Sequence, residues 1–333
     1  MQAMTGAFAS TSFPLIGITD VTDAAHRIAP HLPATPFRRY AQLSDLLGTD
    51  VFVKHENHQP TGAFKVRGGI NLALQLSDDE RQRGLISAST GNHGQSIAYA
   101  ARLAGTNAVI CVPENANPLK VAAIRAFGAE VIPYGRDFDE AREHCDELSR
   151  ERGYRYVHSG NEPHLIAGVA TATLEMLTVE PDIDVVIVPI GGGSGAAGAC
   201  IVAKALRPAI QVIGVQSEAA PAAYRSWRDG QIVEDRMGTF AEGLATRVGF
   251  ELPQAILREH LDDFVLVDDD EIRDAMLQMV TATSSLVESA GAAPLAAAVR
   301  MRERLQGKKV ALVASGGNVH VRQLKELLDT LPL

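Results

Sequence analysis

The stretch Val185-Val186-Ile187-Val188-Pro189-Ile190-Gly191-Gly192-Gly193-Ser194-Gly195 joins an apolar run to a glycine-rich turn, and a helical pattern follows from Ala196. Uncharged apolar runs of this length are typical of strands that are buried on both faces of a parallel sheet. Glycines let the backbone approach an anion closely, and the free N–H groups at the start of a helix favour negative charge. This stretch therefore predicts a strand, a phosphate-binding turn and a helix in an α/β fold.

The rest of the chain repeats this alternation of apolar runs and helical patterns, which favours mainly parallel sheets flanked by helices. The expected strands are Val51–Lys54, Gly84–Ser89, Ala108–Val112, Val131–Pro133, Val185–Ile190, Gln211–Val215, Phe264–Val267 and Val310–Ala314. The expected helices are Gly94–Ala104, Pro118–Phe127, Phe138–Arg152, Pro163–Thr178, Ala196–Leu206, Asp270–Ser284 and Ala292–Leu305. Gly128 should end the second helix, Asp137 should cap the third, and Asp268 or Asp269 should start the sixth.

Three consecutive strand–helix units predict a small α/β domain over residues 81–158, inserted into a large domain formed by residues 1–80 and 159–333. Open parallel sheets bind ligands at the carboxyl ends of their strands. We therefore expect the active site in the cleft between the two domains.

Composition narrows the class of protein. The 333 residues are 46% hydrophobic and 21% charged, as in an ordinary globular protein, and the net charge of −9 argues against nucleic acid as a partner. Cys111, Cys145 and Cys200 are widely spaced and predict reduced thiols. The first 17 residues lack the basic region and apolar stretch of a signal peptide, and residues 185–203 contain a proline and five glycines, unlike a membrane span. We expect a cytoplasmic protein that acts on a small molecule.

One lysine stands out among only seven. Lys65 lies in Pro60-Thr61-Gly62-Ala63-Phe64-Lys65-Val66-Arg67-Gly68, between an aromatic and a β-branched residue. Most lysines are solvated surface residues, but an amine beside apolar side chains loses its proton more readily. A neutral amine is what forms a Schiff base with an aldehyde. The other candidates stand in turns or late in helices, at Lys204, Lys308, Lys309 and Lys325.

A second polar turn, Ser89-Thr90-Gly91-Asn92-His93-Gly94, also joins a strand to a helix. Its hydroxyl and N–H groups can bind a carboxylate, although residues of these types also cap helices with no ligand. His93 is not expected to bind a metal, because no second ligand stands at a usable spacing.

Two further functions remain open at this point. Gly193-x-Gly195-x-x-Gly198, with Glu218 about 20 residues on, matches the dinucleotide fingerprint, so a nicotinamide-dependent oxidoreductase is one alternative. A non-catalytic α/β protein that binds a ligand is the other.

Four motifs occur together: TGAFKVRG at 61–68, STGNHGQ at 89–95, GGGSG at 191–195 and SGGN at 315–318. In this combination and order the chain resembles the fold-type II pyridoxal-phosphate enzymes of the threonine/serine dehydratase and serine racemase family, from Thr35 to Asn318. The resemblance implies a tryptophan synthase β-like fold with two open twisted sheets, and a likeness in activity to enzymes that convert a 3-hydroxy amino acid into a 2-oxo acid and ammonia. It also implies a homodimer. The alternative activity within the same family is racemisation of an amino acid.

The resemblance assigns roles to individual residues. Lys65 would carry the cofactor and take the α-proton of the substrate, the glycine loop would hold the phosphate, and Ser315 would bind the pyridine nitrogen. The cofactor contacts that it implies are Phe64, Lys65, Asn92, Gly191, Gly192, Gly193, Ser194, Gly195, Glu288 and Ser315. The substrate contacts that it implies are Ser89, Thr90, Gly91, Asn92, His93 and Gly160.

This chain also departs from the family pattern. Thr90 stands where racemases of the family place a catalytic serine. Its hydroxyl is expected to be able to serve as a second catalytic acid or base, but its extra methyl group disfavours racemisation as the main activity. Gln216 and Ala222 replace two acidic residues of the family's divalent-cation site, so we expect no metal there. Gly160 replaces an asparagine or a bulky residue, which predicts room for a β-substituent as large as the phenyl group of phenylserine. No C-terminal regulatory domain is expected after Asn318.

Overall fold

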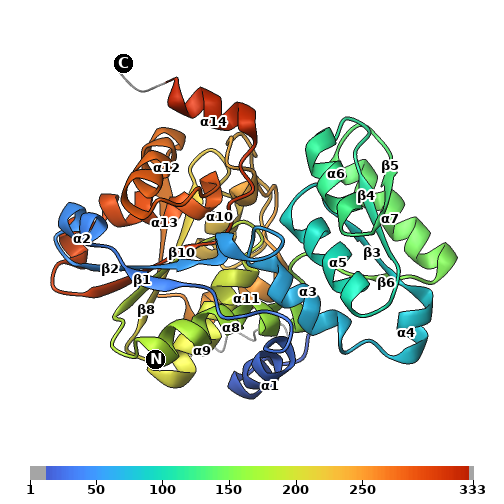
Figure 1. The fold of residues 1–333 in the computed structure, drawn as a ribbon, viewed down its shortest axis with the longest axis horizontal. Helices are drawn as coiled ribbons and strands as arrows, with labels where there is room; N and C mark the ends of the chain where they lie inside the picture. Colours follow the sequence, from blue (N-terminus) through green and yellow to red (C-terminus); the bar gives the residue numbers. More distant parts are fainter. Residues whose placement is uncertain (1–12, 330–333) are drawn as a thin grey trace, which may run out of the picture.

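The structure is a computed structural model that describes residues 13–329. Most of the stretch examined for a signal peptide, residues 1–12, lies outside the described residues, as do residues 330–333. Two open sheets form the centres of two lobes (Figure 1). Among residues 13–329, no helix is long and apolar enough to cross a lipid bilayer.

The large lobe contains a six-stranded sheet in the order β1-β2-β10-β7-β8-β9. All neighbouring strands are parallel except for β1 and β2. Its strands are β1 (Phe37–Arg39), β2 (Asp50–His55), β7 (Val185–Pro189), β8 (Gln211–Ser217), β9 (Asp263–Val267) and β10 (Lys309–Ala314). The small lobe, residues 85–156, contains a parallel sheet in the order β5-β4-β3-β6. Its strands are β3 (Leu85–Ala88), β4 (Ala108–Val112), β5 (Glu130–Pro133) and β6 (Arg155–Tyr156).

Helices cover both faces of the large sheet. The helices of one face are α1 (Ile18–Ile28), α8 (Pro163–Val179), α9 (Ser194–Leu206), α10 (Ala222–Arg228) and α11 (Glu251–His260). Those of the other face are α2 (Ala41–Leu47), α12 (Asp269–Thr283) and α13 (Ser289–Arg300), with α14 (Val321–Leu328) at the end (Figure 1). Val185 and Ile187 pack into one core, whereas Val186 and Val188 pack into the other. The uncharged run on β7 is therefore buried on both faces, as the sequence predicted.

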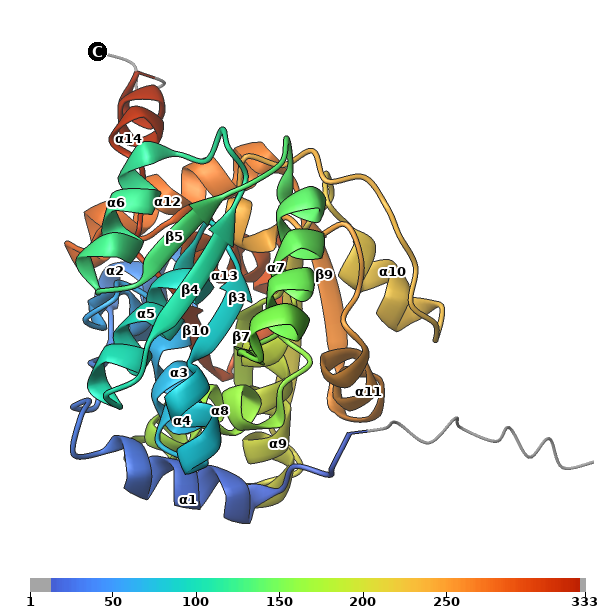
Figure 2. The same ribbon diagram turned by 90° about the vertical axis from the view of Figure 1, so that its right-hand side faces the viewer.

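The small lobe, drawn in teal and green, stands beside the large sheet (Figures 1 and 2). Helices α5 (Asn92–Leu103) and α6 (Pro118–Ala126) share its main core, and α7 (Phe138–Arg152) covers the opposite face. Two more helices, α3 (Lys65–Ala73) and α4 (Asp78–Arg83), lead into it from β2. The short 3₁₀ segments are η1 (Glu56–His58), η2 (Glu242–Leu244) and η3 (Arg302–Leu305).

Every strand and helix that the sequence predicted is present, with shifts of a few residues at the ends. Asp137 and Asp268 cap α7 and α12, and Gly128 follows α6 with a positive φ of 97°. The expected helix Ala292–Leu305 is in fact α13 followed by η3. The elements that the sequence did not predict are α1, α2, α3, α4, α10, α11, α14, β1 and β6.

The most important missed element is α3, which begins at Lys65. Gly68 and Gly69 lower its helix propensity, by about 1 kcal/mol each relative to alanine. Packing outweighs this cost, because a Cβ on Gly68 would come 2.8 Å from the carbonyl oxygen of Leu165 in α8. Helix α3 packs between α5 and α8, and this contact places Lys65 between the two lobes.

Candidate active site

The amine of Lys65 lies in the interior, at the junction of three segments. Its Nζ donates hydrogen bonds to the Ser194 hydroxyl at 2.8 Å and to the Ser159 carbonyl at 3.2 Å, and it lies 5.1 Å from the centre of the Phe64 ring. No carboxylate pairs with it within the described residues. Burial lowers the pKa of Lys65 to about 8, so the neutral amine is accessible near physiological pH.

The glycine loop from Gly191 to Gly195 connects β7 to α9. Within the part of the chain that the structure describes, none of its five backbone N–H groups donates a hydrogen bond to a protein acceptor. Gly193 has a φ of 88°, which is strained for any other residue, and a Cβ on Gly191 would come 2.3 Å from the carbonyl oxygen of Gly243. Free N–H groups at a helix start form an anion site, so the loop fits a phosphate.

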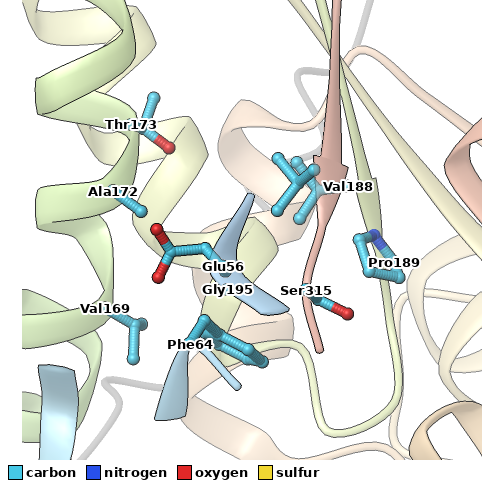
Figure 3. Close-up of a pocket in the computed structure, with 10 residues that line it drawn as sticks. Glu56, Phe64, Val169, Ala172, Thr173, Val188, Pro189, Gly195 and Ser315 are labelled. Atoms are coloured by element: carbon cyan, nitrogen blue, oxygen red, sulfur yellow. The ribbon is translucent and has the colours of Figure 1, made fainter. Parts of the chain in front are cut away.

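The lysine segment is joined to the SGGN segment by backbone hydrogen bonds. The N–H of Phe64 donates to Ser315, and that of Gly317 donates to Gly62. Ser315 is 5% exposed, and its hydroxyl has no hydrogen bond among the described residues. Phe64, Gly195 and Ser315 also line one cavity, which Glu56 lines as well (Figure 3). The ends of β7 and β10 and the start of α3 thus meet at one place.

Asn92 connects the two lobes at this site. Its Nδ2 donates to the carboxylate of Glu288 at 2.8 Å, and its Oδ1 accepts from Asn318 at 2.8 Å. Burial raises the pKa of the Glu288 carboxyl, although the Asn92 hydrogen bond opposes this rise. Asn92, Glu288 and Asn318, which are far apart in the sequence, therefore form one hydrogen-bonded chain.

In the turn before α5, one residue caps the helix and others border open space. The Ser89 hydroxyl accepts hydrogen bonds from the N–H groups of Gly91 and Gly94, at 3.2 and 3.0 Å, so it acts as a local cap. No atom lies within 4 Å of the position of a Cβ on Gly91, which leaves open space at the helix start. Thr90 is partly exposed beside it.

His93 differs from the expectation for a substrate-binding side chain. Its ring is buried, with Nε2 lying 2.9 Å from the Ser87 hydroxyl and 3.3 Å from the Val157 carbonyl. Burial lowers the pKa of His93 to about 3, so the ring is neutral and connects α5 to β3. Its Nε2 is therefore engaged by β3 and the segment after β6, whereas its buried Nδ1 has no hydrogen-bond partner among the described residues.

The extra room expected at Gly160 is not present, and that expectation was wrong. A Cβ on Gly160 would come 2.4 Å from Cδ2 of Phe250, because the phenyl ring occupies this space. No local sequence pattern indicates this contact, since the two residues are 90 positions apart.

Comparison with known proteins places these residues in a family. Residues 28–316 match the family described as "Pyridoxal-phosphate dependent enzyme". The L-threonine ammonia-lyase of Thermotoga maritima is 37% identical over 317 residues, 95% of this chain and 79% of the relative. The L-threo-3-hydroxyaspartate ammonia-lyase of Saccharomyces cerevisiae is 36% identical, over 93% of this chain and 95% of the relative. The solved structure of threonine deaminase isoform 2 from Solanum lycopersicum superposes with a TM-score of 0.89 and 31% identity, over 94% of this chain and 87% of that chain.

This chain belongs to the pyridoxal-phosphate dependent enzyme family. The fold and the cofactor predicted from the sequence are confirmed, and the relatives support an ammonia-lyase activity. The residues present fit the cofactor of the family. The Lys65 amine of lowered pKa contacts Ser194 at the start of α9. The glycine loop before this helix offers free N–H groups, and the unengaged Ser315 hydroxyl lines a cavity together with Gly195 of that loop.

The family match rules out the nicotinamide alternative, and two local contacts explain the residues that suggested it. Gly198 lies against α8, where a Cβ would come 2.8 Å from the Cα of Ala170, so its small size serves helix packing. Glu218, the expected ribose ligand, pairs with Arg300 at 2.9 Å. The fingerprint spacing in this pyridoxal-phosphate enzyme thus reflects packing.

Gln216 fills a structural role with its amide. It is fully buried, its Nε2 donates to the Leu244 carbonyl at 3.3 Å, and its Oε1 accepts from the N–H of Tyr224 at 3.0 Å. Among residues 13–329 there is no group of three or more His, Cys, Asp or Glu residues that could hold a metal ion.

A buried ion-pair network supports the lysine helix, and the sequence analysis missed it. Arg67 binds both carboxylate oxygens of Glu56, at 2.7 and 2.8 Å, and reaches Glu175 at 2.7 Å. Burial opposes the charge of Glu56, but the Arg67 guanidinium outweighs it and holds the pKa of Glu56 at about 2. The position of Arg67 in the same motif, two residues after Lys65, was the available signal.

A second missed contact joins the two lobes directly. Lys120 of α6 forms an ion pair with Glu242 of η2. Burial lowers the pKa of Lys120, and the nearby Glu288 carboxylate opposes this change. Because Gly243 next to this pair touches the glycine loop at Gly191, the contact lies at the edge of the site.

Proposed function

We propose that this chain is a dehydratase that converts a 3-hydroxy amino acid of the L-threonine or L-serine type into a 2-oxo acid and ammonia. The observation that carries the proposal is the contact between the Lys65 amine and Ser194, which begins the helix after the glycine loop. It brings a base of lowered pKa next to a phosphate cradle. The names of the relatives, an L-threonine ammonia-lyase among them, support the same substrate class.

The proposal assigns the cofactor to residues of both lobes. The N–H groups of the loop from Gly191 to Gly195 would hold its phosphate, and the Ser315 hydroxyl would bind its ring nitrogen. Phe64, Asn92 and Glu288 would surround its ring, and Lys65 would carry it covalently. When bound, pyridoxal phosphate withdraws electrons from the substrate Cα and so makes the α-proton acidic.

The substrate would lie between the lysine and the start of α5. The open space at Gly91 would accept its carboxylate, with the N–H groups of the turn and the Thr90 hydroxyl as donors. The Lys65 amine would be free to take the α-proton once the substrate amino group has displaced it from the cofactor, and its lowered pKa suits a base near neutral pH. The β-hydroxyl would take up one proton and leave as water, and hydrolysis of the released aminoacrylate would consume one water and give the 2-oxo acid and ammonia.

Three further assignments belong to this proposal. We infer a small domain of residues 81–158, supported by a sheet whose strands all lie between residues 85 and 156. We also infer a cytoplasmic homodimer. The net charge of −9 supports a small-molecule partner over nucleic acid.

The test is a panel of 3-hydroxy amino acids incubated with the purified protein and pyridoxal phosphate. L-threonine or L-serine should release a 2-oxo acid and ammonia in equal amounts, and the Lys65→Ala protein should release neither. Chiral chromatography of the remaining substrate distinguishes racemisation. Inversion of the substrate without release of ammonia, or no reaction with any substrate, would contradict the proposal.

A further inference from the structure

Phe250 occupies the space that a side chain at Gly160 would fill. A Cβ on Gly160 would come 2.4 Å from its Cδ2, and a Cβ on Gly192 would come 2.3 Å from its Cε2. Carbon atoms in favourable contact are about 3.5–4 Å apart, so neither glycine can carry a side chain while the ring stays in place. One edge of the ring is thus inserted between two glycines.

These two glycines belong to the loops that surround Lys65. Gly160 follows Ser159, whose carbonyl accepts a hydrogen bond from the lysine amine at 3.2 Å. Gly192 lies in the glycine loop, two residues before Ser194, the other partner of that amine. The Phe250 ring therefore touches both of the segments that hold the reactive nitrogen.

The ring is held in place without being part of a core. Phe250 is partly exposed and belongs to none of the buried apolar clusters among the described residues. His158 packs edge-on against it, with ring centres 4.9 Å apart at 80°. The next turn is fixed by a hydrogen bond from the N–H of Leu252 to the Oδ1 of Asn161, at 3.1 Å. The ring is therefore positioned by its neighbours and keeps a partly exposed surface.

We propose that Phe250 determines which β-substituent the substrate can carry. This inference rests on the proposed function. The phenyl ring, at the start of α11, forms a wall of the substrate site where Gly160 has no side chain. This wall limits both the size and the polarity of the β-substituent. A hydrogen atom or a methyl group fits beside an apolar ring. A phenyl group collides with it, and a carboxylate loses its hydration there without gaining a partner.

The first experiment compares kcat/KM of the wild type and Phe250→Ala for L-threonine, L-threo-phenylserine and L-threo-3-hydroxyaspartate. The wild type should prefer L-threonine to both others. In Phe250→Ala the ratio of phenylserine to threonine should rise about tenfold or more, a size discrimination typical of an apolar pocket. Phe250→Leu keeps part of the volume and should shift the ratio in the same direction by less, which retains a test if the alanine variant does not fold.

The second experiment moves the aromatic ring from one loop to the other. Gly160→Phe alone should lose stability, because its Cβ meets the ring at 2.4 Å. In the background of Phe250→Ala, the same substitution should restore the wall and return the threonine preference. The two changes are thus expected to be strongly non-additive, as for residues in contact.

A substrate ratio that stays constant in Phe250→Ala would overturn the inference. If all three substrates lose activity by the same factor, the ratio is also constant, and the ring then only supports the loop. Failure of the proposed function is a separate result, because the wild type would then release no 2-oxo acid from any substrate.

Discussion

The Nζ of Lys65 lies 2.8 Å from the Oγ of Ser194, so the first residue of α3 contacts the first residue of α9. These residues are 129 positions apart in the sequence. Their contact joins the lysine segment, which is bonded to the SGGN segment, to the glycine loop. The chemistry proposed above depends on this junction.

The lowered pKa of Lys65 predicts how the cofactor-free protein takes up pyridoxal phosphate. Only the neutral amine attacks the aldehyde, and burial brings the pKa of Lys65 from 10.5 to about 8. The rate of covalent attachment, followed by visible absorbance after mixing, should therefore rise with pH around a midpoint near 8. A midpoint above 10, as in an exposed lysine, would contradict this prediction.

The same shift has a consequence for stability. Between pH 8 and 10.5 the unfolded chain binds the Lys65 proton more than the folded chain does. The contribution of Lys65 to the free energy of unfolding of the cofactor-free protein should thus increase with pH in this window. Urea unfolding of the wild type and Lys65→Met across the window measures it. Parallel pH curves for the two proteins would refute the assignment.

Removing Arg67 should strongly destabilise the protein. Arg67→Met leaves the fully buried Glu56 carboxylate without its main partner, a loss of about 3–5 kcal/mol in the free energy of unfolding. The matched control is Arg39→Met, which breaks the exposed pair with Asp50 and should cost about 0–1 kcal/mol. Urea denaturation measures both, and equal losses would contradict the role given to the network.

The amide of Gln216 predicts a response to a single-atom change. Gln216→Glu replaces the donor to the Leu244 carbonyl with a buried carboxylate, which should cost about 1–3 kcal/mol at pH 7. Burial raises the pKa of such a carboxyl, so the loss should shrink as pH falls toward 5. Gln211→Glu, at an exposed position of the same strand, is the control.

A chelator should leave the wild-type activity unchanged, and a chelator-sensitive wild type would contradict the expected loss of the cation site.

Much of the fold could be predicted from local sequence. The strands β4 and β7 are uncharged apolar runs, and α7 has both its cap at Asp137 and a glycine at its end, so each is readable without tertiary information. The glycine loop was predictable because the positive φ of Gly193 and the close approaches at Gly191 and Gly192 require glycine. Helix α3 was not, since Gly68 is favourable only against Leu165, about 100 residues away.

For the site as well, some features were predictable from the sequence and others were not. The motifs marked Lys65, Asn92 and Ser315 as residues that could meet, and the structure brings them to one junction. Side-chain direction was not predictable, because the His93 ring turns toward Ser87 only once β3 is in place. The role of Phe250 was not predictable for a similar reason, since its contact with Gly160 arises from the packing of α11 against the loop after β6.

The most direct measurement is the site of covalent attachment of the cofactor. The holoenzyme is reduced with borohydride, digested, and analysed by mass spectrometry. We expect one pyridoxyl group per chain, on the peptide that contains Lys65 and on that lysine alone. A pyridoxyl group on another lysine, such as Lys120 at the edge of the cleft, or no adduct in a protein that turns over substrate, would contradict this expectation.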